Sequence, residues 1–242
     1  LQKSDDVYKD LLSVLGLKEV RSDTQGSSPK PGIYGVFSKD PGGQVIASLF
    51  AQELSGYGSC LYISFSEFPH FFDGNERENN ENKRGLGELI FKLDQKTYKS
   101  SVEELSIPYG HARRVYGVLH FRDIYDISNK DAKTMLKRIA SECGFEYLLI
   151  YTDSMPSLVM TADEYDRVYY LKKKQNSELD IMRFKSYLEV EDKGSFSEGV
   201  VIADLPEDIE FWGGELAGED SDTWLNNPKR KVFAERMWKD EQ

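Results

Sequence analysis

A continuous apolar run, Tyr147–Thr152, constrains the fold of this chain more than any other segment of its sequence. A strand with this composition is buried on both faces, as the central strands of a parallel sheet are. Helical patterns separate it from other apolar segments of strand length, so the sequence predicts a doubly wound α/β fold with a mostly parallel sheet and helices on both faces. The other predicted strands are Gly32–Ser38, Cys60–Phe65, Val115–Phe121, Val168–Leu171 and, as another central strand, Gly199–Ala203.

The clearest predicted helix lies before the apolar run. Ser128 or Asn129 serves as its N-cap, and Gly144 ends it. One face of this helix is apolar at helical spacing, with Ala132, Met135, Leu136, Ile139 and Ala140. Further helices are predicted over Gln44–Leu54, over Gly87–Gln95 and from Ser177 to Leu188.

The composition is that of a globular protein and argues against two classes of partner. The chain has 242 residues, 39% of them hydrophobic, and a formal net charge of −11. Because nucleic-acid binding needs Lys and Arg to neutralise phosphates, no nucleic-acid partner is expected. No apolar run approaches the ~18 residues that span a bilayer, so membrane contact is at most peripheral. Cys60 and Cys143 are predicted to be buried free thiols in a reducing cytoplasm.

Two regions are predicted along the chain. Residues 1–31 form an N-terminal helix and linker, because Asp5–Leu15 has apolar residues at helical spacing and Ser22–Pro31 is rich in Ser, Gly and Pro. Residues 32–242 form a single domain. Because the chain starts at Leu1 rather than Met, we expect it to be a fragment of a longer protein.

The segment Gly35–Val45 joins a predicted strand to a predicted helix through a Gly-containing turn. In phosphate-binding loops, backbone N–H groups and the helix N-terminus of such a segment point at the anion. A Gly-Gly turn between a strand and a helix is also simply a turn in many proteins. The segment therefore predicts either a phosphate-binding loop or an ordinary connection.

This segment resembles the deviant Walker A motif, K-G-G-x-G-K-[ST], of the MinD/ParA superfamily of P-loop ATPases. Without gaps, Lys39 falls on the signature lysine and Gly43 on the last glycine, with Gly42 beside it. Gln44 falls on the phosphate-gripping lysine, and Val45 on the Ser or Thr that binds Mg²⁺. The resemblance thus marks a nucleotide-binding loop that has lost two of its functional side chains.

Two further strands extend the resemblance. Cys60–Glu67 is similar to the superfamily's second strand, which usually ends in aspartates, and here Ser64 stands at one such position and Ser66 or Glu67 near the other. Phe145–Thr152 looks like the Walker B stretch, with Tyr151 in place of the metal-associated aspartate. Asp153 lies two positions further on, so Glu67 and Asp153 are candidate acidic or water-positioning residues.

These replacements predict a degenerate site. An ammonium about 4 Å from a phosphate charge is worth about 4 kcal/mol at an effective dielectric of roughly 20, and Gln44 supplies no charge. Val45 offers no oxygen to Mg²⁺, while Asp40 adds a negative charge and Pro41 removes an N–H donor. We therefore expect no catalytic residue, no bound metal and no cofactor. The alternative is a slow NTPase or weak nucleotide switch that binds ATP with Mg²⁺ weakly and dimerises on it.

Within the superfamily the chain is most similar to the CpaE/TadZ-like proteins of pilus assembly, over roughly Asp6–Glu207. The resemblance implies a cytoplasmic homodimer that acts as a localisation or assembly scaffold, with protein partners from a pilus or secretion assembly through which it reaches the membrane. It also implies an upstream receiver-like domain. In an active relative, the lysine at the position of Lys39 would reach across the dimer to the phosphate of the partner. The alternative is that Lys39 is an ordinary exposed loop lysine.

Other possible sites are weaker. His70, His111 and His120 are spaced too widely for a local metal motif, and Glu215–Asp222 lacks the spacing of an EF-hand loop. No G-x-S-x-G elbow supports a serine nucleophile. The basic stretch Lys229–Trp238 is similar to the membrane-contacting tail of MinD-like proteins, but Phe233 and Met237 at helical spacing favour a terminal helix packed on the domain.

Overall fold

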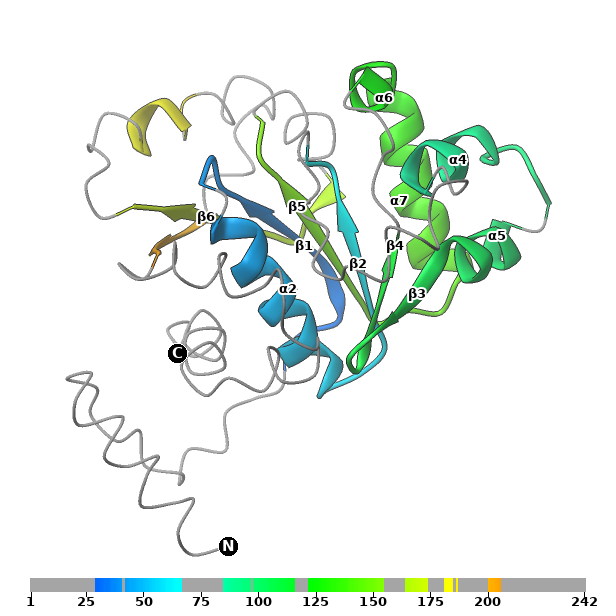
Figure 1. Ribbon diagram of the computed structural model, residues 1–242, viewed down its shortest axis with the longest axis horizontal. Helices are drawn as coiled ribbons and strands as arrows, with labels where there is room; N and C mark the ends of the chain where they lie inside the picture. The colour runs from blue at the N-terminus through cyan, green and yellow to red at the C-terminus, as the bar shows by residue number, and fades with distance from the viewer. Residues whose placement is uncertain are drawn as a thin grey trace, which may run out of the picture.

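The computed structural model describes residues 29–40, 42–66, 85–96, 98–115, 122–154, 164–173, 181–184, 186 and 200–205. Figure 1 shows the arrangement of its helices and strands. In chain order they are β1 (Gly32–Phe37), α2 (Gly42–Ser55), β2 (Cys60–Ser64), α4 (Gly85–Phe91), α5 (Tyr98–Leu105), β3 (Ser106–Tyr109), β4 (Ala112–Val115), α6 (Arg122–Tyr125), α7 (Asn129–Glu142), β5 (Tyr147–Thr152), β6 (Arg167–Lys172) and β7 (Val200–Asp204).

The strands form one mostly parallel sheet in the order β3-β4-β2-β5-β1-β6-β7. Only β3 is antiparallel to its neighbour, β4. The strand β5 pairs with both β1 and β2 along its length, so the apolar run Tyr147–Thr152 is a central strand, and all six of its residues are buried. The predicted doubly wound α/β fold is confirmed.

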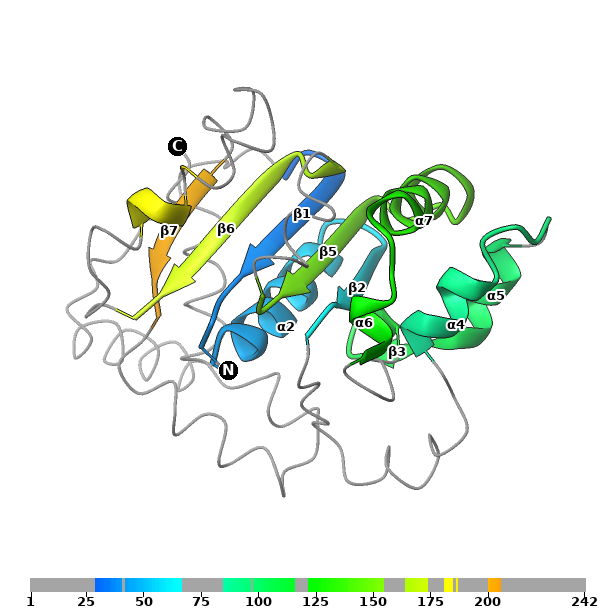
Figure 2. The ribbon, with the colours of Figure 1, turned by 90° about the horizontal axis from the view of Figure 1, so that it is seen from above.

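Helices cover the sheet on both faces and bury two separate cores. The helix α2 packs with Val36, Tyr62 and Leu149 on one face. On the other face, α7 packs with Leu61, Ile63 and Ile150, together with α4 and α5. Figures 1 and 2 show α2 and α7 on opposite sides of the strands. Side chains that alternate along each strand therefore enter different cores, as the period of two requires.

The helix α7 confirms the predicted caps. Ser128 lies in extended conformation, and its Oγ accepts a hydrogen bond from the Asp131 N–H at 3.1 Å. Gly144, with φ of 77°, lies in the left-handed region just after the helix, where glycine carries no Cβ penalty. The buried face consists of Ala132, Met135, Leu136 and Ile139, whereas Ala140, also expected on this face, is exposed.

Three expectations need correction. The strand β7 is the outermost on its side of the described sheet, not a central one. The strand expected at Val115–Phe121 begins earlier, at Ala112, and residues 116–121 lie outside the described residues. The helix expected at Gly87–Gln95 begins at Gly85 and ends at Phe91.

Other sequence predictions fall partly or wholly outside the described residues. Of the helix expected from Ser177 to Leu188, residues 181–184 and 186 are described and are helical. The N-terminal helix and the stretch Lys229–Trp238 are not described, and the division at residue 31 stays a prediction. Among the helices that are described, none is long and apolar enough to cross a membrane.

Both cysteines are free thiols, as predicted, but only Cys60 is fully buried. Burial raises the pKa of the Cys60 thiol to about 12 and that of the half-buried Cys143 thiol to about 11. Thiols with such high pKa values stay protonated and are poor nucleophiles near neutral pH. Neither cysteine is therefore a candidate for catalysis.

Candidate functional site

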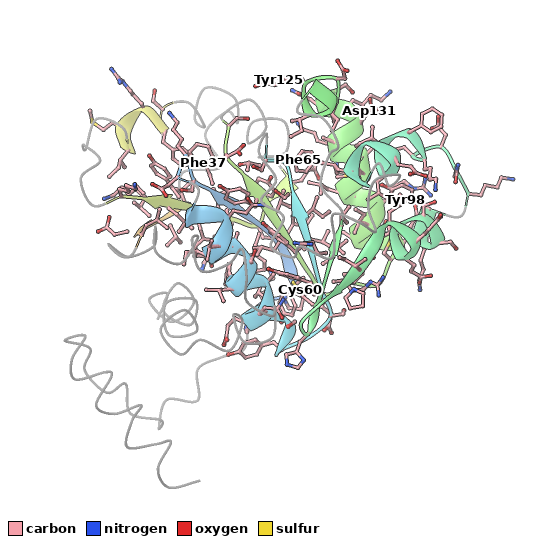
Figure 3. The ribbon with its side chains drawn as sticks, viewed as in Figure 1. Phe37, Cys60, Phe65, Tyr98, Tyr125 and Asp131 are labelled. Atoms are coloured by element: carbon pink, nitrogen blue, oxygen red, sulfur yellow. The ribbon has the colours of Figure 1, made fainter. Side chains whose placement is uncertain are left out.

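The loop after β1 lies where the order of the sheet reverses. From β1 the chain crosses to β2 on one side of the sheet, and β6 lies on the other side of β1. Ligands of open α/β sheets bind outside the carboxyl ends of the strands at such a switch point. Figure 3 shows Phe37 and Phe65 at this end of β1 and β2, with Cys60 at the opposite end. The fold therefore places the predicted loop where a ligand site is expected.

Backbone hydrogen bonds fix the start of this loop to the neighbouring strand ends. The Ser38 N–H donates to the Thr152 carbonyl at 3.1 Å, and the Phe65 N–H donates to the Tyr151 carbonyl at 2.8 Å. The carboxyl ends of β1, β2 and β5 are thus held together. The residues that directly follow these three strands therefore lie close together at this edge of the sheet.

Asp40 caps the helix α2 from within the loop. Its carboxylate Oδ1 accepts a hydrogen bond from the Gly42 N–H at 3.0 Å, and its carbonyl accepts one from the Gly43 N–H at 2.8 Å. Its second carboxylate oxygen lies 2.9 Å from Nζ of Lys173, just after β6. The two hydrogen bonds from Gly42 and Gly43 are those by which an N-cap residue satisfies the first N–H groups of a helix. The first two N–H groups of α2 are therefore already bonded to Asp40.

Gln44 and Val45, where the sequence resemblance expects a lysine and a hydroxyl, are both buried. The Gln44 side chain is only 3% exposed, and its Nε2 lies 3.5 Å from Ser64 Oγ in a long hydrogen bond. Val45 is also 3% exposed and belongs to the core between α2 and the sheet. Lys39, by contrast, is exposed at the surface of the loop.

Tyr151, where the sequence resemblance expects a metal-associated aspartate, holds the start of the loop through a hydrogen bond. Its ring is buried and its hydroxyl donates to the Ser38 carbonyl at 3.2 Å. Burial, and to a lesser extent the nearby Asp153 carboxylate, raises the pKa of Tyr151 well above its usual value. The phenol therefore keeps its proton and remains a hydrogen-bond donor.

Asp153 lies next to Ser66, and the Ser66 Oγ donates a hydrogen bond to Asp153 Oδ2. The Ser66 N–H donates in turn to Ser64 Oγ at 3.3 Å. Glu67, the other candidate acidic residue, lies outside the described residues, as do His70 and His120. Within the part of the chain that is described, no three His, Cys, Asp or Glu side chains gather as metal ligands would.

The closeness of Ser38 to Gly43 makes a testable prediction. A Cβ on residue 43 would lie 2.1 Å from Ser38 Cβ and 2.5 Å from its Oγ, so an alanine cannot be accommodated without moving the loop. We expect Gly43→Ala to lower the free energy of unfolding by about 2–3 kcal/mol in urea denaturation. In the control Gly56→Ala the nearest atom is 3.2 Å away, and we expect a loss below about 1 kcal/mol. Equal losses in the two variants would contradict this packing of the loop.

No family model matches the sequence, and no curated protein matches it. Solved structures do match the fold. A ParA-family ATPase from Chlorobium tepidum TLS superposes with a TM-score of 0.60 at 16% identity, over 86% of this chain and 98% of that one. The chain has the ParA/MinD fold. A putative plasmid partition protein from Borrelia burgdorferi bound to AMPPNP gives 0.59 at 11% identity, over 86% and 99% of the two chains.

The MinC:MinD cell division protein complex of Aquifex aeolicus matches with a TM-score of 0.53 at 11% identity, over 85% of this chain and 89% of that one. At these identities the similarity shows the P-loop NTPase-like α/β fold and leaves the chemistry to be argued from the site. Gln44 and Val45 lie in the first turn of α2, and Tyr151 lies near the end of β5 with its hydroxyl bonded to the Ser38 carbonyl.

Sequence reasoning missed Lys173 and the capping role of Asp40. The signal for the cap was available, because Asp-Pro-Gly-Gly places a good N-cap residue and a proline just before a helical pattern. No local signal points to Lys173, which reaches the loop only because β6 pairs with β1.

Proposed function

We propose that this chain is a catalytically degenerate member of the MinD/ParA superfamily, similar to CpaE/TadZ-like proteins, that acts as a localisation or assembly scaffold for pilus or secretion machinery. It carries out no efficient nucleotide hydrolysis. Its function depends on its surfaces, as a homodimer with protein partners in the cytoplasm, and it associates with the membrane only through a partner. The shared fold and the sequence resemblance of the loop support this proposal.

One observation carries the proposal. The three positions at which the resemblance expects a lysine, a hydroxyl and a carboxylate hold Gln44, Val45 and Tyr151, and all three side chains are buried. Gln44 contacts Ser64, Val45 fills the core and Tyr151 hydrogen-bonds the Ser38 carbonyl. These residues contribute to the stability of the loop rather than to phosphate or magnesium binding. Because all three side chains are packed in the interior, rotation of one of them would not produce a working nucleotide site.

A scaffold needs partners, and the fold is known in complexes. One structure that shares it is the MinC:MinD cell division protein complex. This supports a protein partner for the present chain, with a pilus or secretion component as the class that the sequence resemblance suggests.

The contact between Ser66 and Asp153 favours a second candidate, a weak nucleotide switch or slow NTPase. It places a half-buried carboxylate at the carboxyl ends of β2 and β5, close to the loop. In such a protein Lys39, Gln44, Asp153 and Glu67 would take adapted roles. Micromolar binding of ATP with Mg²⁺ that promotes dimerisation would favour this candidate over the scaffold.

Localisation in the source cell tests the proposed function. We expect a fluorescent fusion of the chain to form discrete foci, because a scaffold is held in place by its partners. Lys39→Ala and Gln44→Met should form the same foci at equal protein levels, since neither changes a working nucleotide site. Diffuse fluorescence of the unchanged chain, or dispersal of the foci by either substitution, would contradict the proposal.

A further inference from the structure

We propose that the ion pair between Asp40 and Lys173 is an autoinhibitory contact that keeps external anions out of the loop after β1. The inference rests on the proposed function, because it concerns the regulation of the same site. It gives a cause of inactivity that does not depend on Gln44, Val45 or Tyr151.

Groups from separate parts of the chain hold the Asp40 carboxylate in place. The Gly42 N–H donates to Oδ1 at 3.0 Å from the start of α2, and the Lys173 ammonium lies 2.9 Å from Oδ2 after β6. The Asp40 N–H donates to Ser38 Oγ at 3.1 Å. The carboxylate is thereby held at the first turn of the helix, between the Gly42 N–H and the Lys173 ammonium.

The Asp40 carboxylate would oppose phosphate binding in two ways. It competes for the same donor groups, and its negative charge repels the phosphate. The phosphate would need the Gly42 N–H and the Lys173 ammonium, which both already bind Asp40. Because the Asp40 side chain is only 14% exposed, solvent screens its charge less than it screens a surface carboxylate. A like charge about 4 Å away weakens anion binding by a factor of several hundred at an effective dielectric of roughly 20.

A second ion pair at the end of β6 supplies a matched control. Lys172, the residue before Lys173, pairs with Asp204 at the end of β7. Asp204 belongs to the outermost described strand on that side of the sheet, two strands away from β1. Asp204→Asn therefore removes an equal charge from the same end of the sheet and leaves the loop contacts unchanged.

The test is binding of inorganic pyrophosphate and of ATP to the full chain, by calorimetry and by the amide NMR shifts of Gly42 and Gly43. The variants are Asp40→Gly, Asp40→Asn and the control Asp204→Asn. Asn at position 40 keeps an oxygen that can cap α2 and removes only the charge. Gly removes both the oxygen and the charge, at little cost to helix capping. Thermal melting confirms that each variant is folded.

We expect pyrophosphate affinity to rise at least about tenfold in Asp40→Gly, with shifts at both glycine amides, and to rise less in Asp40→Asn. Asp204→Asn should bind no better than the unchanged chain. The inference is overturned if folded Asp40→Gly and Asp40→Asn both bind no better than the unchanged chain, or if Asp204→Asn gains as much. Those results would leave the proposed function intact, because that function is tested by the localisation of the unchanged chain and by its own response to nucleotide, and not by the Asp40 variants.

Discussion

Tyr151→Asp, which restores the residue type expected from the Walker B resemblance, should lower the free energy of unfolding by about 3–5 kcal/mol at pH 8. The position is buried, and its electrostatic neighbours include the carboxylates of Asp153 and Asp40. An aspartate there would be a buried negative charge close to two other carboxylates, and it would leave a void where the tyrosine ring packs. Urea denaturation measures the loss.

Tyr151→Phe is the matched control for this substitution. It keeps the ring and removes only the hydrogen bond to the Ser38 carbonyl, so we expect a loss of about 1 kcal/mol. If Tyr151→Asp were as stable as Tyr151→Phe, the site would retain the capacity to hold a Walker B carboxylate.

The loss in Tyr151→Asp should also depend on pH. Burial and nearby negative charges raise the folded-state pKa of a carboxyl group above its unfolded value of about 3.9. Between the unfolded-state pKa and the higher folded-state pKa, the folded protein binds the proton and the unfolded chain does not. The free energy of unfolding of the variant therefore falls as pH rises between these two pKa values. Relative to the unchanged chain, the variant should be destabilised less at pH 5 than at pH 8. The same loss at both pH values would show that the carboxyl group is not buried as the structure requires.

The central part of the sheet was predictable because its local signals agree with the fold. Five of the six buried residues of Tyr147–Thr152 are apolar, with Thr152 as the exception, and Ser128 and Gly144 mark the two ends of α7. Such signals need no information about the rest of the chain. The helix predicted from Gln44 is present, and Gln44 and Val45 lie in its first turn.

The features that sequence reasoning missed depend on distant parts of the chain. The strands β3 and β4 have four residues each, with Arg113 and Arg114 inside β4, and short polar strands carry no clear alternation. The strand β7 is as apolar as a central strand, so its sequence does not report its outer position. The contact of Lys173 with Asp40 exists only because the sheet brings β6 beside β1.

The absence of tight nucleotide binding is the prediction with the largest expected effect. An intact loop supplies a lysine ammonium and a magnesium ligand, whereas here Gln44 and Val45 are buried and Asp40 binds the Gly42 N–H. Loss of the ammonium alone corresponds to a factor of several hundred in affinity, from about 4 kcal/mol at an effective dielectric of roughly 20. Loss of the metal ligand and the added Asp40 charge act in the same direction.

Calorimetric titration of the unchanged chain with ATP and Mg²⁺ measures this effect most directly. Our account predicts no saturable heat below about millimolar nucleotide. Saturable micromolar binding, accompanied by ATP turnover that Gln44→Met abolishes, would contradict it.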